Sequence, residues 1–366
     1  MGFYLALIST SLYSQKLKTM KLQRTKNGRM SIGLITSVVV MILMVSQVHA
    51  QKNETSISSR NGVHNFSSRN GGDKYEVEYK GRIEFLEDDK SIKSISRGGY
   101  MRFKISDYRD KRELLAESVG GNIEYEYYLD RKKADFDADR EEWLADNLVT
   151  IIRATGIGAE ARVERYYKNS GVDGVLEEIS EVRGDYVSHI YLQELLDQDG
   201  LKDDEIVKIA AYVPKELSSD YYISEVFKDN GRLFTKNDKT IEAFLSAMGR
   251  MDSDYYISEI LADVLREDLS NGALDKVLDN LGNMDSDYYK SQVIKDVFRN
   301  DLSKPQMISL LASIDEINSD YYKSSVLKGA CRLVSDSDDE VKSSFRKATK
   351  GIRSDYYYGS VARCID

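Results

Sequence analysis

Residues 253–256 read Ser-Asp-Tyr-Tyr, and the same four residues begin again at Ser219, Ser286, Ser319 and Ser354. A shorter copy, Asp185-Tyr186, precedes them, so that six Asp-Tyr copies follow one another at separations of 35, 34, 33, 33 and 35 residues. A period of this length is typical of stacked supersecondary units that bury their apolar faces on their neighbours. The repeat therefore predicts a solenoid, an architecture that commonly serves binding.

Apolar residues follow each copy at helical intervals. After Tyr256 they stand at Ile260, Leu261, Val264 and Leu265, which predicts that the second tyrosine of a copy lies on the buried face of a helix. Ser or Asp just before a helix is a preferred N-cap worth about 1 kcal/mol, and the acid also suits the helix dipole. Each copy is thus expected to begin the second helix of a pair. The first helices are expected near residues 172–182, 203–213, 239–249, 272–282, 305–317 and 338–350.

The first tyrosine of each copy falls beside the buried stripe, so these rings are expected to form a ladder along the stack. The six candidate binding residues are Tyr186, Tyr221, Tyr255, Tyr288, Tyr321 and Tyr356. In one interpretation each ring packs on the adjacent repeat and its hydroxyl bonds to a neighbouring loop. In the other, the rings line a groove, as aromatic side chains of binding surfaces do. The first copy has Val187 in place of the second tyrosine, which makes the first tyrosine the less replaceable one.

Apolar and polar residues alternate over residues 74–135, for example at Met101, Phe103 and Ile105. Such period-two patterning predicts half-buried antiparallel strands, about five or six of them, separated by turn signals such as Gly120-Gly121. A helix expected over residues 139–155 would cover their apolar face. The predicted fold class is α+β: a small antiparallel β-meander module, connecting helices over residues 136–170, and an α-solenoid of about six HEAT- or TPR-like helix pairs over residues 171–366.

The N-terminal region has the pattern of a targeting segment. Residues 1–50 contain six basic and no acidic side chains, an apolar run of 14 residues at 32–45, and Val48-His49-Ala50 at the end. The run is shorter than the roughly 20 residues of a spanning helix, so the pattern predicts a secretory signal peptide, with an uncleaved anchor as the alternative. Residues 51–73 are rich in Ser, Asn and Gly and are predicted to form a disordered linker.

The net charge limits the expected partners, and the two cysteines raise the question of a disulfide. Without residues 1–50, 46 basic and 61 acidic side chains remain, a net charge of −15. Nucleic acid is therefore not an expected partner, and a membrane is expected only through a retained N-terminal segment. The two cysteines, Cys331 and Cys364, predict a disulfide between adjacent repeats of an exported protein. Two small buried hydrophobic residues are the alternative.

The sequence lacks the usual catalytic constellations. It has three histidines, His49, His64 and His189, and neither a His-Glu-x-x-His nor a Cys-x-x-Cys motif, so no enzyme, metal site or cofactor is predicted. The acidic residues between positions 197 and 205 lack the spacing of an EF-hand loop and are interpreted as the acidic first turn of a helix. A hydrolase that uses two carboxylates alone is a further hypothesis, although no pair stands out.

Three segments carry a resemblance to a known family: residues 89–103 (DKSIKSISRGGYMRF), residues 155–163 (TGIGAEARV) and the Ser-Asp-Tyr-Tyr-x-Ser copies. Over roughly residues 75–366 the chain resembles bacterial exported helical-repeat segments, including the C-terminal extracytoplasmic regions of some BlaR1-like sensor proteins. The zinc peptidase domain of that family, with its His-Glu-x-x-His motif, has no counterpart here, so no catalytic residue is carried over. The resemblance implies a β module followed by helical repeats outside the cytoplasm, in a sensing or docking part.

These patterns together predict a non-enzymatic, exported bacterial interaction protein. It is expected to bind a protein or peptide in the periplasm or cell envelope through the surface of its helical repeats, within a sensing system. The alternative prediction is a structural or assembly element of the envelope that has no discrete ligand.

Overall fold

The computed structural model describes residues 54–70 and 73–363. Nearly all of them, residues 55–68 and 73–363, belong to one compact unit. The predicted signal peptide at residues 1–50 lies outside the described residues. Among the described helices, none combines the length and the apolar character needed to cross a membrane.

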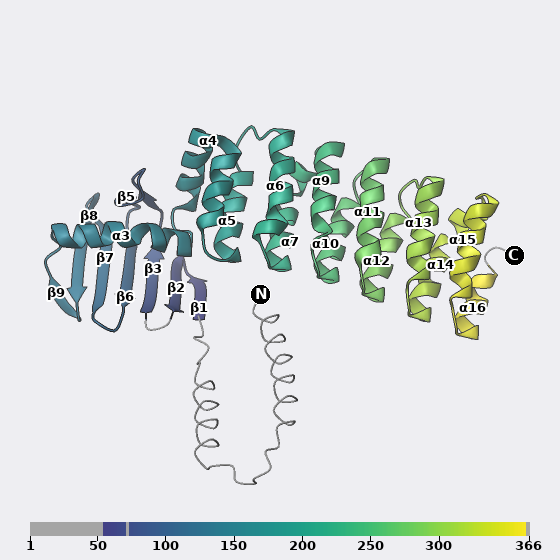
Figure 1. The fold of residues 1–366 in the computed structure, drawn as a ribbon, viewed down its shortest axis with the longest axis horizontal. Coiled ribbons are helices and arrows are strands. Elements are labelled where there is room, and N and C mark those ends of the chain that lie inside the picture. The colour runs from purple at the N-terminus through teal and green to yellow at the C-terminus, as the bar shows by residue number, and fades with distance from the viewer. Residues whose placement is uncertain (1–53, 71–72, 364–366) are drawn as a thin grey trace, which may run out of the picture. The chain divides into compact units, whose positions relative to one another are not determined.

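The N-terminal part of this unit is built on a seven-stranded sheet with the order β1-β2-β3-β6-β7-β8-β9 (Figure 1). The strands are β1 (Glu54–Arg60), β2 (Val63–Asn70), β3 (Asp73–Lys80), β6 (Tyr100–Ser106), β7 (Lys111–Val119), β8 (Asn122–Leu129) and β9 (Lys132–Ala134). A separate hairpin of β4 (Ile83–Phe85) and β5 (Ile92–Ile95) stands between β3 and β6 in the chain. The sheet is thus a meander that one hairpin interrupts.

The register of the sheet puts one apolar row on a single face. Val77 pairs with Phe103, Phe103 with Leu114, and Leu114 with Tyr127, and all four are almost fully buried. Helix α3 (Ala138–Thr155) covers this face, where Trp143 stacks on Phe103 with ring centroids 5.0 Å apart. The predicted cover for the apolar face is therefore present.

The linker predicted over residues 51–73 is wrong for its described part, which forms β1 and β2. Asn61 and Gly62 between them both have positive φ, 53° and 73°, as a two-residue Asn-Gly hairpin turn requires. Phe66 on β2 is buried in the core of the module. The polar residues of β1 and β2 are held in strands by pairing with the neighbouring strand. Composition alone does not predict such pairing.

The rest of the unit is a series of paired helices (Figure 1). They are α4 (Ala159–Glu181), α5 (Asp185–Leu196), α6 (Asp203–Glu216), α7 (Asp220–Asp229), α8 (Gly231–Phe234), α9 (Asp238–Met248), α10 (Asp254–Val264), α11 (Asn271–Asn283), α12 (Asp287–Val297), α13 (Lys304–Asp315), α14 (Asp320–Ser335), α15 (Asp339–Lys350) and α16 (Asp355–Ala362). The solenoid-like arrangement after an antiparallel sheet confirms the predicted α+β class. The last of the connecting helices expected over residues 136–170 and the helix expected near 172–182 are joined in α4, interrupted only at Gly171, where φ is 64°.

The six second helices, α5, α7, α10, α12, α14 and α16, all begin at the Asp of an Asp-Tyr copy. They form one layer, because each contacts the next along the chain, while α6, α9, α11, α13 and α15 form the other. A single apolar core runs between the layers from Ala159 to Val361. Since every copy sits at the same place in its helix, the layer presents the same residues once per repeat.

Candidate functional site

The tyrosines of the Asp-Tyr copies lie in the first turns of the second helices. The first tyrosine of a copy is 46–58 % exposed at Tyr221, Tyr255, Tyr288 and Tyr321, and 79 % exposed at Tyr356. Tyr186 in the first copy and the second tyrosines are half-buried. Rings of this size usually bury most of their surface, so their exposure in register along one layer marks a distinct surface.

The rings touch one another without interruption, each first tyrosine contacting its own second tyrosine and that of the next repeat. Consecutive ring centroids are 5.0–6.3 Å apart and the ring planes meet at 63–75°. We call this row the tyrosine stripe. In spatial order it comprises Tyr186, Tyr222, Tyr221, Tyr256, Tyr255, Tyr289, Tyr288, Tyr322, Tyr321, Tyr357 and Tyr356.

The two ends of the stripe follow from this pattern. The second tyrosine of a repeat bridges to the repeat before it. The first copy has no Asp-Tyr copy before it, and Val187 fills that position as a buried core residue. Among the described residues Tyr356 contacts only Tyr357 of its own copy within the stripe, and it is the most exposed of the first tyrosines.

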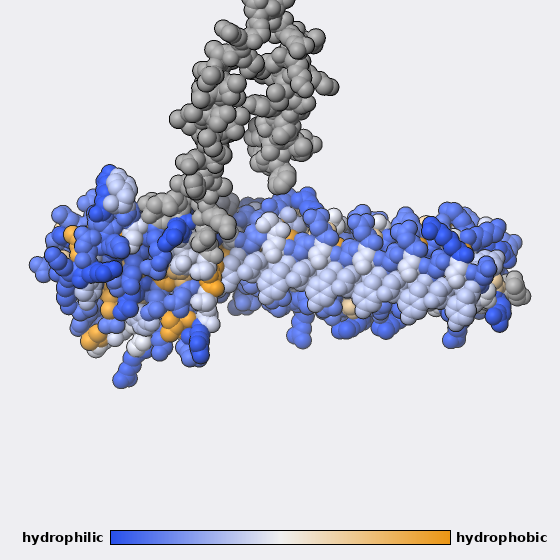
Figure 2. All heavy atoms as spheres, turned by 90° about the horizontal axis from the view of Figure 1, so that it is seen from below, coloured by the Kyte–Doolittle hydropathy of each residue, from blue (hydrophilic) through white to orange (hydrophobic). Residues whose placement is uncertain are grey.

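The structure agrees in part with each interpretation of the ladder, packing on the adjacent repeat or lining a binding surface. The rings do pack across repeats, yet the hydroxyls do not reach neighbouring loops in the described residues. Tyr221 donates a hydrogen bond of 3.5 Å to Glu225 of its own helix. The ring surface that remains open is what a binding role needs. Figure 2 shows it as a pale, continuous band of ring-bearing side chains along the helical repeats.

The Asp of each copy links its repeat to the next one. Asp287 accepts hydrogen bonds from the backbone N–H groups of Asn318 (3.1 Å, to Oδ1) and Ser319 (2.7 Å, to Oδ2). Equivalent bonds to the following turn are made by Asp185, Asp220, Asp254 and Asp320. The expectation that Ser caps its own helix is wrong, because no side-chain cap bond forms at Ser219, Ser253, Ser286, Ser319 or Ser354.

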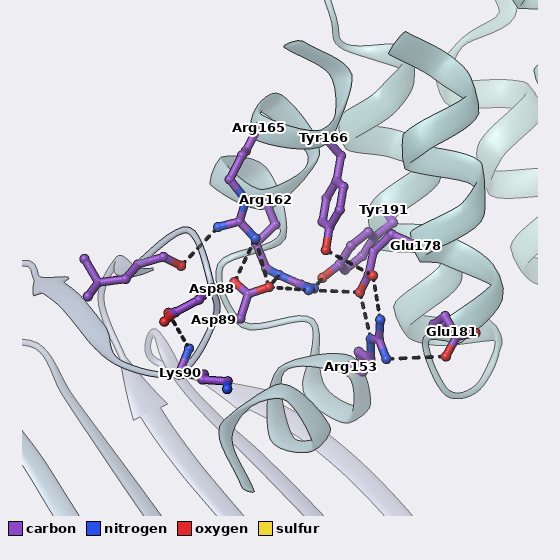
Figure 3. Close-up of polar contacts among 11 residues, drawn as sticks. Asp88, Asp89, Lys90, Arg153, Arg162, Arg165, Tyr166, Glu178, Glu181 and Tyr191 are labelled. Carbon is purple, nitrogen blue, oxygen red and sulfur yellow. Dashed lines mark hydrogen bonds and ion pairs between the residues drawn. The ribbon is translucent and has the colours of Figure 1, made fainter. Parts of the chain in front are cut away.

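A buried polar cluster joins the β4–β5 turn to the first helices (Figure 3). Nε and Nη2 of Arg162 donate to Oδ2 of Asp89 at 3.0 and 2.8 Å, and Nη2 also donates to Oε1 of Glu178 at 2.9 Å. Arg162 further donates to the hydroxyl of Tyr191. Arg162, Asp89 and Glu178 are each no more than 5 % exposed. The cluster fixes the β module on the helical repeats, and sequence reasoning did not find it.

Two further arginines balance the charge of this cluster. Arg165 donates to Asp89 at 2.8 Å, and Arg153 donates to Glu178 at 2.8 and 2.9 Å. Nearby, Gly158 has φ of 73°, and a Cβ there would lie 2.9 Å from the ring of Phe85 on β4. A glycine is therefore needed where the hairpin meets the start of α4.

Burial and ion pairing act in opposite directions on Glu178. Burial alone would raise the pKa of its carboxyl, but hydrogen bonds from Arg153 and the charge of Arg162 outweigh it and hold the pKa below its usual value. Burial raises the pKa of Tyr191 to about 12, which keeps its phenol neutral beside Arg162. The cluster thus consists of paired charges that stabilise one another rather than a proton donor or acceptor poised for catalysis.

This shift in pKa predicts acid sensitivity. Because the pKa of Glu178 is lower in the folded than in the unfolded chain, its stabilising effect is present above about pH 4.5 and is lost as pH falls through the folded pKa. The difference in free energy of unfolding between the wild type and Glu178→Gln should be largest at neutral pH and shrink below pH 4.5. Urea unfolding at a series of pH values measures it. A difference that stays constant down to pH 3 contradicts the prediction.

The remaining candidate residues do not gather into a site. Among the described residues no group of three or more His, Cys, Asp or Glu could hold a metal ion. Asp203 and Asp204 begin α6 and bond to Lys236 and Lys239 of the next repeat. Cys331 lies half-buried on α14, but Cys364 lies outside the described residues, so the disulfide stays a prediction.

One cleft of about 540 Å³ lies away from the tyrosine stripe, at the C-terminal ends of α5, α7 and α10. Its lining mixes apolar residues such as Phe227 and Phe244 with acidic and basic side chains such as Asp263 and Arg232. His189 is not part of this lining; it lies on α5 with its ring 5.3 Å from that of Tyr222. Burial lowers the pKa of His189, which favours the neutral imidazole at neutral pH.

Comparison with known proteins does not identify a family. No family model matches the chain, and no curated protein matches it. A solved structure described as "Computational Design of Self-Assembling Cyclic Protein Homooligomers" aligns at 11% sequence identity over 62% of this chain and 93% of that chain, with a TM-score of 0.13. That score carries no argument, and the resemblance to BlaR1-like sensor proteins stays a prediction.

Proposed function

We propose that this chain is a non-enzymatic binding protein that holds a protein or peptide against the tyrosine stripe. The observation that carries the proposal is the uninterrupted row of eleven rings, five of which are about half or more exposed. Tyrosine is enriched at protein interfaces because its large ring makes apolar contacts while its hydroxyl serves as a hydrogen-bond donor.

The stripe is also preorganised. Each inner ring, such as Tyr255 or Tyr288, touches two other rings at centroid distances of 5.0–5.9 Å. A partner that docks on such rings does not have to pay the full entropy of immobilising them. The stripe can therefore contribute affinity along its whole length without rearranging.

The cellular setting is proposed from the sequence. The signal-peptide pattern of residues 1–50 supports export, and the resemblance supports a bacterial periplasm or envelope and a sensing system. The second candidate is a structural element of the envelope without a discrete ligand. The contacts of the rings with one another favour it, since rings that only hold repeats together need no partner.

Selection from a library of displayed random peptides tests the proposal. The wild-type protein should enrich a common peptide motif, and the double variant Tyr255→Ala/Tyr288→Ala should lose at least tenfold of the affinity for it. Each substitution removes two ring contacts of about 0.5–1.5 kcal/mol, so the fold should persist, which circular dichroism and thermal unfolding check.

The matched control is Tyr108→Ala, which removes an exposed tyrosine of the β module that lies outside the stripe. It should leave both binding and stability unchanged. If the wild type enriches no peptide, or if the double variant and the wild type bind alike, the binding proposal fails. A double variant that unfolds outright would favour the structural candidate.

A further inference from the structure

We infer that the ligand of the tyrosine stripe is a basic, proline-rich segment in the polyproline II conformation, with proline and Lys or Arg recurring every third residue. The inference rests on the proposed function and adds the chemistry of the partner. Spacing, hydrogen-bonding capacity and charge along the stripe support it in turn.

The spacing of the stripe suits this conformation. Packed helices lie 8–10 Å apart, so the stripe repeats roughly once every 8–10 Å. Polyproline II has three residues per turn and rises about 3.1 Å per residue, which gives a repeat of about 9.3 Å. A β-strand repeats every 6.6–6.8 Å on one face, and two turns of an α-helix span about 10.8 Å. Of the three conformations, polyproline II is the one that can place one side chain in each repeat.

The stripe offers what such a segment lacks internally. A polyproline II segment forms no backbone hydrogen bonds of its own, so its carbonyl groups are free to accept. Within the described residues, the hydroxyls of Tyr255, Tyr288, Tyr321 and Tyr356 make no hydrogen bond, while their rings are about half or more exposed. Aromatic grooves bind proline rings in this conformation at low entropic cost. The stripe therefore provides both the apolar contacts and the donors.

Acidic side chains accompany the stripe. The Asp that precedes each first tyrosine is partly exposed in five of the copies, at Asp185, Asp220, Asp254, Asp287 and Asp320. Asp252 and Asp285, in the turns before α10 and α12, are exposed. In the last repeat Arg353 takes the equivalent place, so charge complementarity to a basic ligand is strongest in the middle of the stripe. This row of acids is why a basic peptide fits better than a neutral glycan, which could also stack on tyrosine rings.

Fluorescence anisotropy of the full chain with three labelled peptides tests the inference. The first consists of five Pro-Pro-Lys triplets, about the length of the five steps between six copies. The second, five Gly-Ser-Lys triplets, keeps the charge without the conformation. The third, five Pro-Pro-Glu triplets, keeps the conformation and inverts the charge. The first peptide should bind at least tenfold more tightly than either of the others.

Variants localise the binding. Tyr255→Ala/Tyr288→Ala should weaken binding of the Pro-Pro-Lys peptide at least tenfold, and Asp252→Asn/Asp285→Asn should weaken it severalfold at low salt. Tyr108→Ala should have no effect. Replacing Tyr255 and Tyr288 by phenylalanine keeps the rings and removes only the hydroxyls. This variant should keep the native fold and therefore tests the hydroxyls even if the alanine variant unfolds.

Equal affinity for the Gly-Ser-Lys and Pro-Pro-Lys peptides would overturn the inference, because charge alone would then explain binding. Binding of a soluble glycan in place of all three peptides would also overturn it, in favour of a carbohydrate ligand. If none of the three binds while the displayed library yields another motif, this inference fails and the proposed peptide-binding function stands. If the library yields nothing either, both fail.

Discussion

Replacement of Arg162 by methionine is expected to lower the free energy of unfolding by about 3–5 kcal/mol. Arg162 is almost fully buried and donates to both Asp89 and Glu178. Methionine fills a similar length but removes the charge, so two buried carboxylates lose a shared partner. Arg165 still pairs with Asp89 and Arg153 with Glu178, which keeps the expected loss within this range.

Urea unfolding at pH 7 measures the effect, and Arg266→Met is the matched control. Arg266 is exposed, and among the described residues it pairs only with Asp263 three residues earlier, an interaction that contributes less than about 1 kcal/mol. The two variants remove the same group from buried and exposed surroundings. Equal losses in the two variants would contradict a central role for the buried cluster.

Replacement of Asp287 by asparagine is expected to cost about 2 kcal/mol of stability. Each carboxylate oxygen of Asp287 accepts one backbone N–H, from Asn318 and from Ser319. Asparagine has one oxygen and an NH₂ group, so one N–H loses its acceptor and faces another donor instead. The interaction between α12 and the turn before α14 is therefore weakened.

Asp355→Asn is the control that the repeat itself provides. Asp355 is also the first residue of its helix, but within the described residues it accepts no hydrogen bond from a following turn. Its replacement removes only the favourable charge at a helix N-terminus, about 0.3–1 kcal/mol. The difference between the two variants in thermal or urea unfolding isolates the link between repeats. If they are equally destabilised, the Asp acts only on its own helix.

Much of the fold could be predicted because it depends on local spacing. The apolar residues that follow Tyr256 within nine positions define a helix face, and every second helix begins at its predicted Asp. Strands β1 and β2 could not be predicted from composition, since their stability comes from pairing in the sheet. The one local signal for them is the Asn-Gly pair at residues 61–62, which suits a two-residue hairpin turn; the linker prediction did not use it.

The site was predictable only in part. The candidate tyrosines are all in the stripe, but the ring-to-ring path depends on how adjacent repeats are stacked. The partner of each Asp is 31–34 residues away, and Arg162 is 73 residues from Asp89. These separations are far longer than the helical or strand period, so local spacing in the sequence cannot predict the contacts. Two of the three segments that carry the family resemblance contain Asp89 and Arg162, but nothing in them indicates the pairing.

The junctions between repeats are interchangeable. From the second copy onward, each junction consists of the same two elements: an Asp that bonds to the turn of the following repeat, and a second tyrosine that reaches back to the first tyrosine of the preceding one. A unit such as residues 254–286 contains both partners of one Asp bond and contributes one ring to the tyrosine contact at either end. Duplication or loss of such a unit would leave all other junctions intact and change the stripe by two rings. Under the proposed binding function, the number of copies would therefore set the length of the extended partner that the stripe can hold.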